Sequence, residues 1–240
     1  MPPFPKCVKQ SSKPSTFCPG CGHQIVLKNI GFAIDNLKMQ NKAMLGLDIG
    51  CSLLAWDFFD IDSLQTHHGR TIPTIVGYKL AKPKSLSIAY LGDGGAYAIG
   101  AQHLVNSAVR DDNITVIVIN NTTYAMTGGQ EAPTTLPGQI TATTPHGADE
   151  YFFKGPESVR CINKDAFIAR TTTTNPIHLL NTIKKAFDWQ LANKGFSYVE
   201  VLSFCPTNWK TPTAETTWAY MQTLEKEYKI GEINVTCTSN

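Results

Sequence analysis

The sequence predicts an α/β protein, a single domain whose mainly parallel sheet is covered by helices on both faces. Four short apolar runs have the length of buried strands, and helical segments lie between them. Strands that alternate with helices in this way form parallel βαβ units. The chain has 240 residues, 42% of them hydrophobic, which is enough for one sizeable core.

The helices and strands are expected in the following order. The first helix starts at Gln24, where apolar residues begin to recur at three- and four-residue intervals along one stripe. The expected buried strands are 43–47, 86–91, 115–120 and 198–202. The expected further helices are 72–82, 97–110 and 176–193.

Two segments lack this alternation. Residues 1–16 are rich in Pro, Ser and Lys, which predicts an extended N-terminal arm. The segment 122–144 is dense in Thr, Gly, Pro and Gln and has little periodicity. Because a loop of that length inside a compact domain is usually functional, we expect this segment to have a function.

The charge of the chain excludes some classes of partner. The formal net charge is +2 and no run of lysines or arginines is present, so neither nucleic acid nor an anionic membrane is an expected partner. Apolar runs such as 114–119 are much shorter than the roughly 20 residues of a membrane helix. The first residues, M-P-P-F-P-K, lack the apolar centre of a signal peptide, which predicts a cytoplasmic protein.

The cysteines raise a question that their own spacing does not answer. Seven are present, and an odd number in a reducing compartment argues against a disulfide framework. Cys18 and Cys21 stand in the stretch F-C-P-G-C-G-H. Such a C-x-x-C pair can bind zinc, form a redox disulfide or ligate part of an iron–sulfur cluster, and all three remain open at this point.

A glycine-rich turn predicts a site for a phosphate and a metal ion. In Y-L-G-D-G-G-A-Y-A-I-G, residues 90–100, a strand leads through Gly-Asp-Gly-Gly directly into a helix. Glycines at such a turn let backbone amides approach a phosphate, and the helix N-terminus adds favourable partial charge. An acidic residue there would repel phosphate unless a cation lay between them. Asp93 is therefore interpreted as a Mg²⁺ ligand.

The next expected strand ends in V-I-N-N-T-T-Y, which offers amide and carbonyl oxygens. Open α/β sheets bind ligands at the carboxyl ends of their strands, and Asn121 follows Asp93 by about one helix and one strand. A lone G-D-G can be a structural turn. Followed by N-N one βαβ unit later, it favours a bound diphosphate and metal ion.

This pair resembles the thiamine diphosphate motif, and the wider sequence resembles one family that carries it. The stretches C-P-G-C-G-H, D-I-G-C-S, H-G-R, G-D-G, N-N-T-T-Y-A-M-T-G-G-Q, A-P-T-T-L-P-G-Q and C-P-T-N-W follow one another as in the β subunit of 2-oxoacid:ferredoxin oxidoreductases. The resemblance covers about residues 16–212. It implies an arm at 1–16, a thiamine diphosphate-binding domain with cluster ligands at 17–212, and a C-terminal helical extension at 213–240.

The resemblance also implies residues that bind the cofactor. Mg²⁺ would be held by the Asp93 carboxylate, the Asn121 side chain and the Thr123 carbonyl, and His23 is carried as a further contact. The other expected cofactor-binding residues are Ile49, Gly50, Cys51, Gly92, Gly94, Gly95, Tyr124, Ala125 and Met126.

One 4Fe–4S cluster is implied as well, held by four thiolates. The matching residues are Cys18, Cys21, Cys51 and Cys205. Without the resemblance, zinc and iron–sulfur have equal weight for the C-x-x-C pair, and the other two are ordinary buried thiols. The cysteines that match no ligand of the family are expected to be free; they are Cys7, Cys161 and Cys237.

The implied reaction is the oxidative decarboxylation of a 2-oxoacid to acyl-CoA and CO₂, with electrons passed through the cluster to ferredoxin. Coenzyme A and ferredoxin are the implied co-substrates. No glutamate here sits in a motif that matches the carboxylate by which thiamine enzymes activate their cofactor. The implied partners are an α subunit that carries that Glu, and γ and δ subunits.

Three residues are candidates for contact with the substrate. His68 and Arg70, in T-H-H-G-R, are expected to bind anions of substrate or cofactor, with a structural role in that loop as the alternative. Met126 stands where pyruvate-using relatives have Asn, which makes that wall of the pocket apolar. We therefore favour a branched-chain 2-oxoacid, 2-oxoisovalerate, with 2-oxoglutarate or pyruvate as alternatives. Two other classes stay open: a non-redox thiamine-dependent decarboxylase and a structural zinc module.

Overall fold

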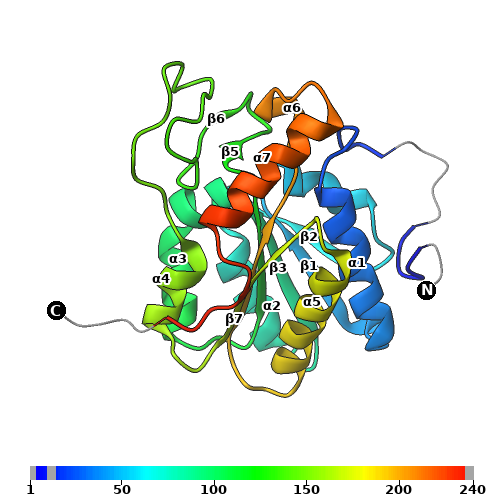
Figure 1. Ribbon diagram of the computed structural model, residues 1–240. Coiled ribbons are helices and arrows are strands. Elements are labelled where there is room, and N and C mark those ends of the chain that lie inside the picture. The colour runs from blue at the N-terminus through cyan, green and yellow to red at the C-terminus, as the bar shows by residue number, and fades with distance from the viewer. Residues whose placement is uncertain (1–3, 10–14, 236–240) are drawn as a thin grey trace.

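The computed structural model describes residues 4–9 and 15–235, which form a three-layer α/β structure with a sheet between two layers of helices (Figure 1). Seven strands lie in the order β2-β1-β3-β4-β8-β7-β9. All neighbouring pairs are parallel except β7 with β9. The predicted fold class is confirmed. The strands are β1 Ala43–Leu47, β2 Asp62–Gln65, β3 Leu86–Gly92, β4 Thr115–Asn120, β7 Phe167–Thr172, β8 Ser197–Leu202 and β9 Gly231–Glu232.

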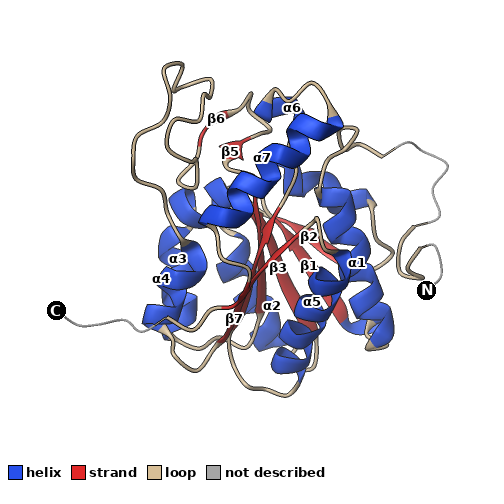
Figure 2. Ribbon diagram, viewed as in Figure 1, coloured by secondary structure: helices blue, strands red, loops and turns tan. Residues whose placement is uncertain are grey.

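Helices cover both faces of the sheet (Figure 2). Helices α1 and α5 pack on one face, and α2, α3 and α4 pack on the other. The central strands β1, β4, β7 and β8 are buried along their whole length, because a parallel sheet between helices has no solvated face. The helices are α1 His23–Asn36, α2 Thr71–Ala81, α3 Ala101–Val109, α4 Gly155–Ile162, α5 Pro176–Leu191, α6 Pro206–Trp209 and α7 Ala214–Glu227.

The four strands expected from apolar runs are confirmed, while β2, β7 and β9 were not predicted. Strand β7, F-I-A-R-T-T, was not predicted because it contains the charged Arg170, which is nevertheless fully buried. Its guanidinium forms ion pairs with Glu200 of β8 and Glu157 of α4, so the charge is compensated inside the protein. Strand β2 is exposed at every position and β9 has two residues, so neither has an apolar signal.

One expected helix, 97–110, is divided. The chain forms a single π-helical segment, η3 Gly95–Ile99, directly after the Gly-Asp-Gly-Gly turn, and α3 begins only at Ala101. A π-helical turn is rare and occurs often at functional sites. The amide of Gly100 donates to the carbonyl of Gly95, 2.8 Å away, which closes this turn.

The described residues near the two ends of the chain pack against the rest of the protein. In the described part of the N-terminal segment, Cys7 is buried and the backbone of Val8 forms a bridge with Phe59. Beyond residue 212, α7 contributes Met221 and Leu224 to a small apolar cluster, and β9 joins the main sheet beside β7. No helix in the described ranges is both long and apolar enough to cross a membrane.

Candidate functional site

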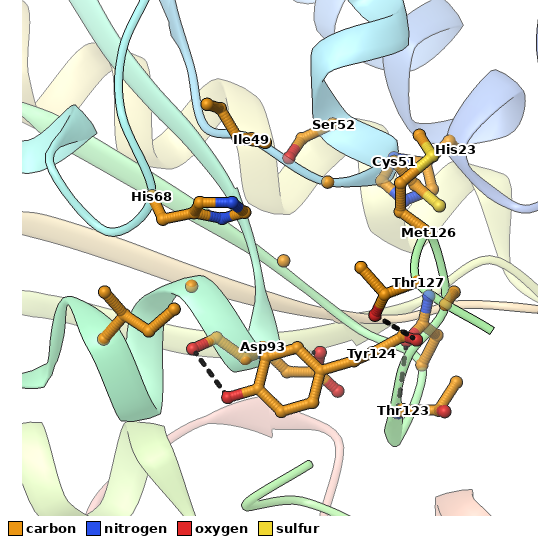
Figure 3. A pocket seen from close by; sticks show the side chains of 17 residues that line it. His23, Ile49, Cys51, Ser52, His68, Asp93, Thr123, Tyr124, Met126 and Thr127 are labelled. Carbon is orange, nitrogen blue, oxygen red and sulfur yellow. Dashed lines mark hydrogen bonds between the residues drawn. The ribbon is translucent and has the colours of Figure 1, made fainter. Parts of the chain in front are cut away.

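A cavity of about 310 Å³ opens at the carboxyl ends of β1, β3 and β4 (Figure 3). Its location agrees with the rule that open α/β sheets bind ligands outside the carboxyl ends of their strands. All the cofactor-binding residues expected from the sequence line it. The lining residues are His23, Ile49, Gly50, Cys51, Ser52, His68, Gly92, Asp93, Gly94, Gly95, Ile99, Asn121, Thr123, Tyr124, Ala125, Met126 and Thr127.

Asp93 forms the floor of this cavity from the end of β3. It is 2% exposed, and its carboxylate accepts hydrogen bonds from the Gly94 amide at 2.8 Å and the Thr134 hydroxyl at 2.6 Å. Burial raises the pKa of Asp93 to about 6, although these two donors lower it. Both donors are neutral, and neither compensates the negative charge of the carboxylate. A divalent cation bound there would do so and would favour the ionised form of Asp93.

The Asn121 turn lies opposite, at the end of β4. The Asn121 side-chain oxygen accepts from the Thr123 amide at 3.3 Å, and its carbonyl accepts from the Trp209 indole at 2.7 Å. Thr122, between them, has a left-handed backbone with φ of 59°. Carboxylate, amide and carbonyl oxygens thus meet at one pocket, and this is the donor set that Mg²⁺ prefers.

The threonine-rich segment 122–144 is joined by hydrogen bonds to the turns at Asp93 and Asn121. A short hairpin, β5 Thr123–Tyr124 and β6 Gln130–Glu131, opens it. The Thr135 hydroxyl donates to the Thr122 carbonyl at 2.7 Å, next to the bond from Thr134 to Asp93. Sequence reasoning assigned no role to Thr134, although A-P-T-T-L was among the motifs that carry the resemblance. The reason for its two threonines is visible only in three dimensions.

Two glycines at the cofactor turn allow very close packing. A Cβ atom at Gly94 would lie 2.1 Å from the Tyr124 ring, and one at Gly95 would lie 1.9 Å from the Asp48 carboxylate. Gly92 differs, because a Cβ there would meet nothing within 4 Å. The turn therefore requires glycine at 94 and 95 for its internal packing.

The four cysteines expected to bind a cluster come together from three loops. The pair precedes α1, Cys51 begins the 3₁₀ helix η2 Cys51–Asp57, and Cys205 precedes α6. Burial, together with the charges of Cys205, Cys21 and Cys18, raises the pKa of Cys51 to about 12. The amide of Gly22 donates to the Phe204 carbonyl at 3.1 Å, which joins the first and last of these loops.

The spacing of these thiols bears on the kind of centre they fit. Across the described residues, no three His, Cys, Asp or Glu side chains approach closely enough to bind one metal ion. A 4Fe–4S cube is wider than a single ion and takes one thiolate at each of four corners. The described structure brings Cys51 close enough to Cys18, Cys21 and Cys205 for their charges to interact.

The remaining cysteines differ from one another. Cys7 is a buried free thiol, as expected. Cys161 is disulfide-bonded, so the expectation of a free thiol was wrong there. Cys237 lies outside the described residues.

The candidate histidines occupy different environments. His23 is 2% exposed, and its Nδ1 lies 2.7 Å from the Tyr90 hydroxyl, with the Phe17 ring stacked against it. Burial lowers the pKa of His23 to about 4. His68 is exposed and lines the cavity, whereas Arg70 does not line it and donates to the Ile99 carbonyl at 3.3 Å.

Comparison with known proteins agrees with this geometry. Residues 48–201 match the family model "Thiamine pyrophosphate enzyme, C-terminal TPP binding domain". The fold and pocket therefore define a thiamine pyrophosphate enzyme domain.

Individual relatives narrow the class. The chain is 41% identical over 207 residues to the 2-oxoglutarate synthase subunit KorB of Methanothermobacter marburgensis, covering 85% of this chain and 70% of that protein. It is 36% identical over 221 residues to the ketoisovalerate oxidoreductase subunit VorA of Methanothermobacter thermautotrophicus, covering 89% of this chain and 46% of that protein. The chain belongs to the β subunits of 2-oxoacid:ferredoxin oxidoreductases, which confirms the resemblance seen in its motifs.

One solved structure supports the same assignment, and a second shares the fold. The 2-oxoglutarate:ferredoxin oxidoreductase of Magnetococcus marinus superimposes with a TM-score of 0.80 at 25% identity, over 98% of this chain and 90% of that one. Benzoylformate decarboxylase of Polynucleobacter necessarius has a TM-score of 0.51 at 15% identity, over 80% of this chain and 35% of that one. The second likeness concerns the fold alone.

Proposed function

We propose that this chain is the catalytic subunit for oxidative decarboxylation of a 2-oxoacid, with thiamine diphosphate and Mg²⁺ in the pocket and a 4Fe–4S cluster beside it. One observation carries the proposal. Cys51 lines the cofactor pocket and also interacts electrostatically with the other three candidate thiols. Cofactor and cluster would then lie on the two sides of Cys51, a short path for electron transfer between them. A thiamine-dependent decarboxylase without redox chemistry has no use for such a group of thiols.

Individual residues have distinct tasks in this proposal. Asp93, the Asn121 side chain and the Thr123 carbonyl hold Mg²⁺, and the glycine turn accepts the diphosphate. When bound, thiamine diphosphate supplies the nucleophilic carbon and the electron sink for decarboxylation. The buried His23 and the aromatic ring of Tyr124 line this space.

The pocket is incomplete without a partner. Among the described residues that line it, Asp93 is the sole carboxylate, and the proposal assigns that group to the metal. The activating Glu therefore comes from an α subunit seated over the pocket. Coenzyme A, ferredoxin and any γ and δ subunits complete the enzyme.

For the substrate, the residues on the pocket wall favour an aliphatic side chain. Ile49, Ile99 and Met126 line it, and no Lys or Arg occurs among its described lining residues. We therefore propose a branched-chain 2-oxoacid such as 2-oxoisovalerate. A second candidate is 2-oxoglutarate, which is favoured by the relative of 41% identity. That substrate needs a cation for its distal carboxylate, which the α subunit would have to supply.

The test is anaerobic co-purification with the α subunit, followed by metal analysis and a panel of 2-oxoacids. We expect about four iron atoms per chain and reduction of a viologen dye that depends on both coenzyme A and a 2-oxoacid. Zinc in place of iron, with no binding of thiamine diphosphate, would instead support a structural zinc module. Decarboxylation without dye reduction or iron would support the non-redox decarboxylase. A higher kcat/KM for 2-oxoglutarate than for 2-oxoisovalerate would reverse the substrate assignment.

A further inference from the structure

Asp48, at the end of β1, is a buried carboxylate that the proposed reaction does not use. It is 0% exposed, and its Oδ1 accepts hydrogen bonds from the Gly69 amide at 2.7 Å and the Thr71 hydroxyl at 3.3 Å. Its own amide donates to the Tyr90 carbonyl at 3.1 Å. Asp48 does not line the pocket, so it can act on a ligand only through other residues.

The other carboxylate oxygen faces the cofactor turn. Within residues 4–9 and 15–235, Oδ2 is buried and has no hydrogen-bond partner. A Cβ at Gly95 would lie 1.9 Å from it, so the carboxylate packs directly on the π-helical segment. A buried carboxyl oxygen without a partner is costly, and such an arrangement persists only where something else requires it.

The turn at Gly69, whose amide donates to Asp48, is also constrained on its other side. Gly69 has a left-handed backbone with φ of 64°, and a Cβ there would lie 2.5 Å from the Gly100 amide nitrogen and 2.7 Å from the Ile99 carbonyl carbon. The turn is thus fixed between β1 and the end of the π-helix. A change at Asp48 would be transmitted to the residue that precedes Gly69.

That residue is His68, whose ring extends into the pocket (Figure 3). The Asp48 carboxylate and His68 interact electrostatically. Among the described lining residues, His23 and His68 are the side chains that can carry a positive charge. His23 is buried and bonded to Tyr90, which leaves His68 to face an anion in the cavity.

We propose that Asp48 is a positioning residue for His68. Its carboxylate fixes the Gly69–Thr71 backbone against the Gly95 turn and thereby holds the His68 imidazole where it binds the carboxylate of the 2-oxoacid. This inference rests on the proposed function, because it takes the anion to be the substrate. The simpler alternative is that Asp48 only stabilises the beginning of α2.

A double-mutant cycle in the complete enzyme distinguishes these roles. The variants are Asp48→Asn, His68→Gln and the double substitution, each assayed for KM of the 2-oxoacid and for kcat. Because Asp48→Asn keeps the size of the side chain and removes its charge, we expect KM to rise about tenfold while kcat changes less. His68→Gln should have a similar effect, and the double variant should be no worse than His68→Gln alone.

Asp35→Asn is the matched control. This carboxylate also accepts a backbone amide, that of Cys7 at 3.3 Å, but it is not among the residues that line the pocket. The substitution should leave KM and kcat unchanged, both in the wild-type background and in combination with His68→Gln. If the free-energy penalties of Asp48→Asn and His68→Gln are additive in the double variant, the positioning role is overturned. Loss of kcat with unchanged KM in Asp48→Asn would overturn it too.

If Asp48→Asn does not assemble, Thr71→Val replaces it in the cycle. It removes the second donor to Oδ1 while the Gly69 bond remains, so the expected rise in KM is smaller, about threefold. Non-additivity with His68→Gln supports the inference, and additivity contradicts it. A wild-type complex that reduces no dye with any 2-oxoacid would contradict the proposed function itself, whereas an active wild type with additive penalties would contradict only the role of Asp48.

Discussion

Replacing Gly94 by alanine should weaken cofactor binding through a single steric contact. The added Cβ would lie 2.1 Å from one carbon of the Tyr124 ring and 2.6 Å from two others. Ordinary carbon contacts are about 3.5 Å or longer, so the ring must move by more than about 1 Å. Because Tyr124 lines the pocket from the hairpin that follows Asn121, its displacement disturbs the space for the thiazolium ring.

Overpacking of this kind costs about 1–3 kcal/mol. If this cost falls on the bound state, the affinity for thiamine diphosphate should decrease about 5- to 150-fold. The assay is calorimetric titration of the α/β complex with thiamine diphosphate at saturating Mg²⁺. Gly77→Ala is the control, because a Cβ at that helical glycine meets nothing within 4 Å and the affinity should stay unchanged. An affinity within twofold of wild type for Gly94→Ala would refute the steric argument.

Three further substitutions test other parts of the structure. Thr134→Val removes a 2.6 Å hydrogen bond to Asp93, which should weaken Mg²⁺-dependent thiamine diphosphate binding about tenfold; unchanged calorimetric affinity would contradict this. Cys205→Ala should lower the iron content after anaerobic reconstitution while thiamine diphosphate still binds, and full iron content would rule Cys205 out as a ligand. Burial alone would raise the pKa of Glu157, but two hydrogen bonds from Arg170 and its charge lower that pKa below the ordinary value. A carboxyl whose pKa is lower in the folded state stabilises it above the ordinary pKa and loses that contribution as pH falls. Glu157→Gln should therefore flatten the loss of stability on acidification, as measured by denaturant unfolding across the acidic range; an unchanged pH profile would show that the ion pair contributes little.

Part of the fold was predictable because its signals are local. The apolar runs of β1, β3, β4 and β8 are buried on both faces, so each strand has a continuous hydrophobic sequence. The run that forms β7 has an arginine in its middle, and its burial depends on Glu157 and Glu200, which stand in other elements. Propensity and periodicity do not contain that information.

Some residues of the candidate site could likewise be predicted from the sequence, and others could not. The turn at Asp93 and the turn at Asn121 each follow an apolar strand. Because strands that alternate with helices are parallel, the sequence predicted that both turns lie at the same edge of the sheet. Thr134 and Trp209 were missed because each reaches its partner, Asp93 or Asn121, across a long separation in sequence. Their motifs, A-P-T-T-L and C-P-T-N-W, could have been noted as candidates but not paired.

By itself, the sequence determined the class of sheet, the edge at which a cofactor binds, and the family, because these depend on motifs read along the chain. The tertiary structure alone decided which distant groups meet. It brought Cys51 to the cofactor pocket and to the other thiols at once, and it placed Asp48 between the Gly69 and Gly95 turns. The physical reason is that these contacts join loops at the ends of different strands. Their distances are set by how the strands pair and how the helices pack, and not by separation along the chain.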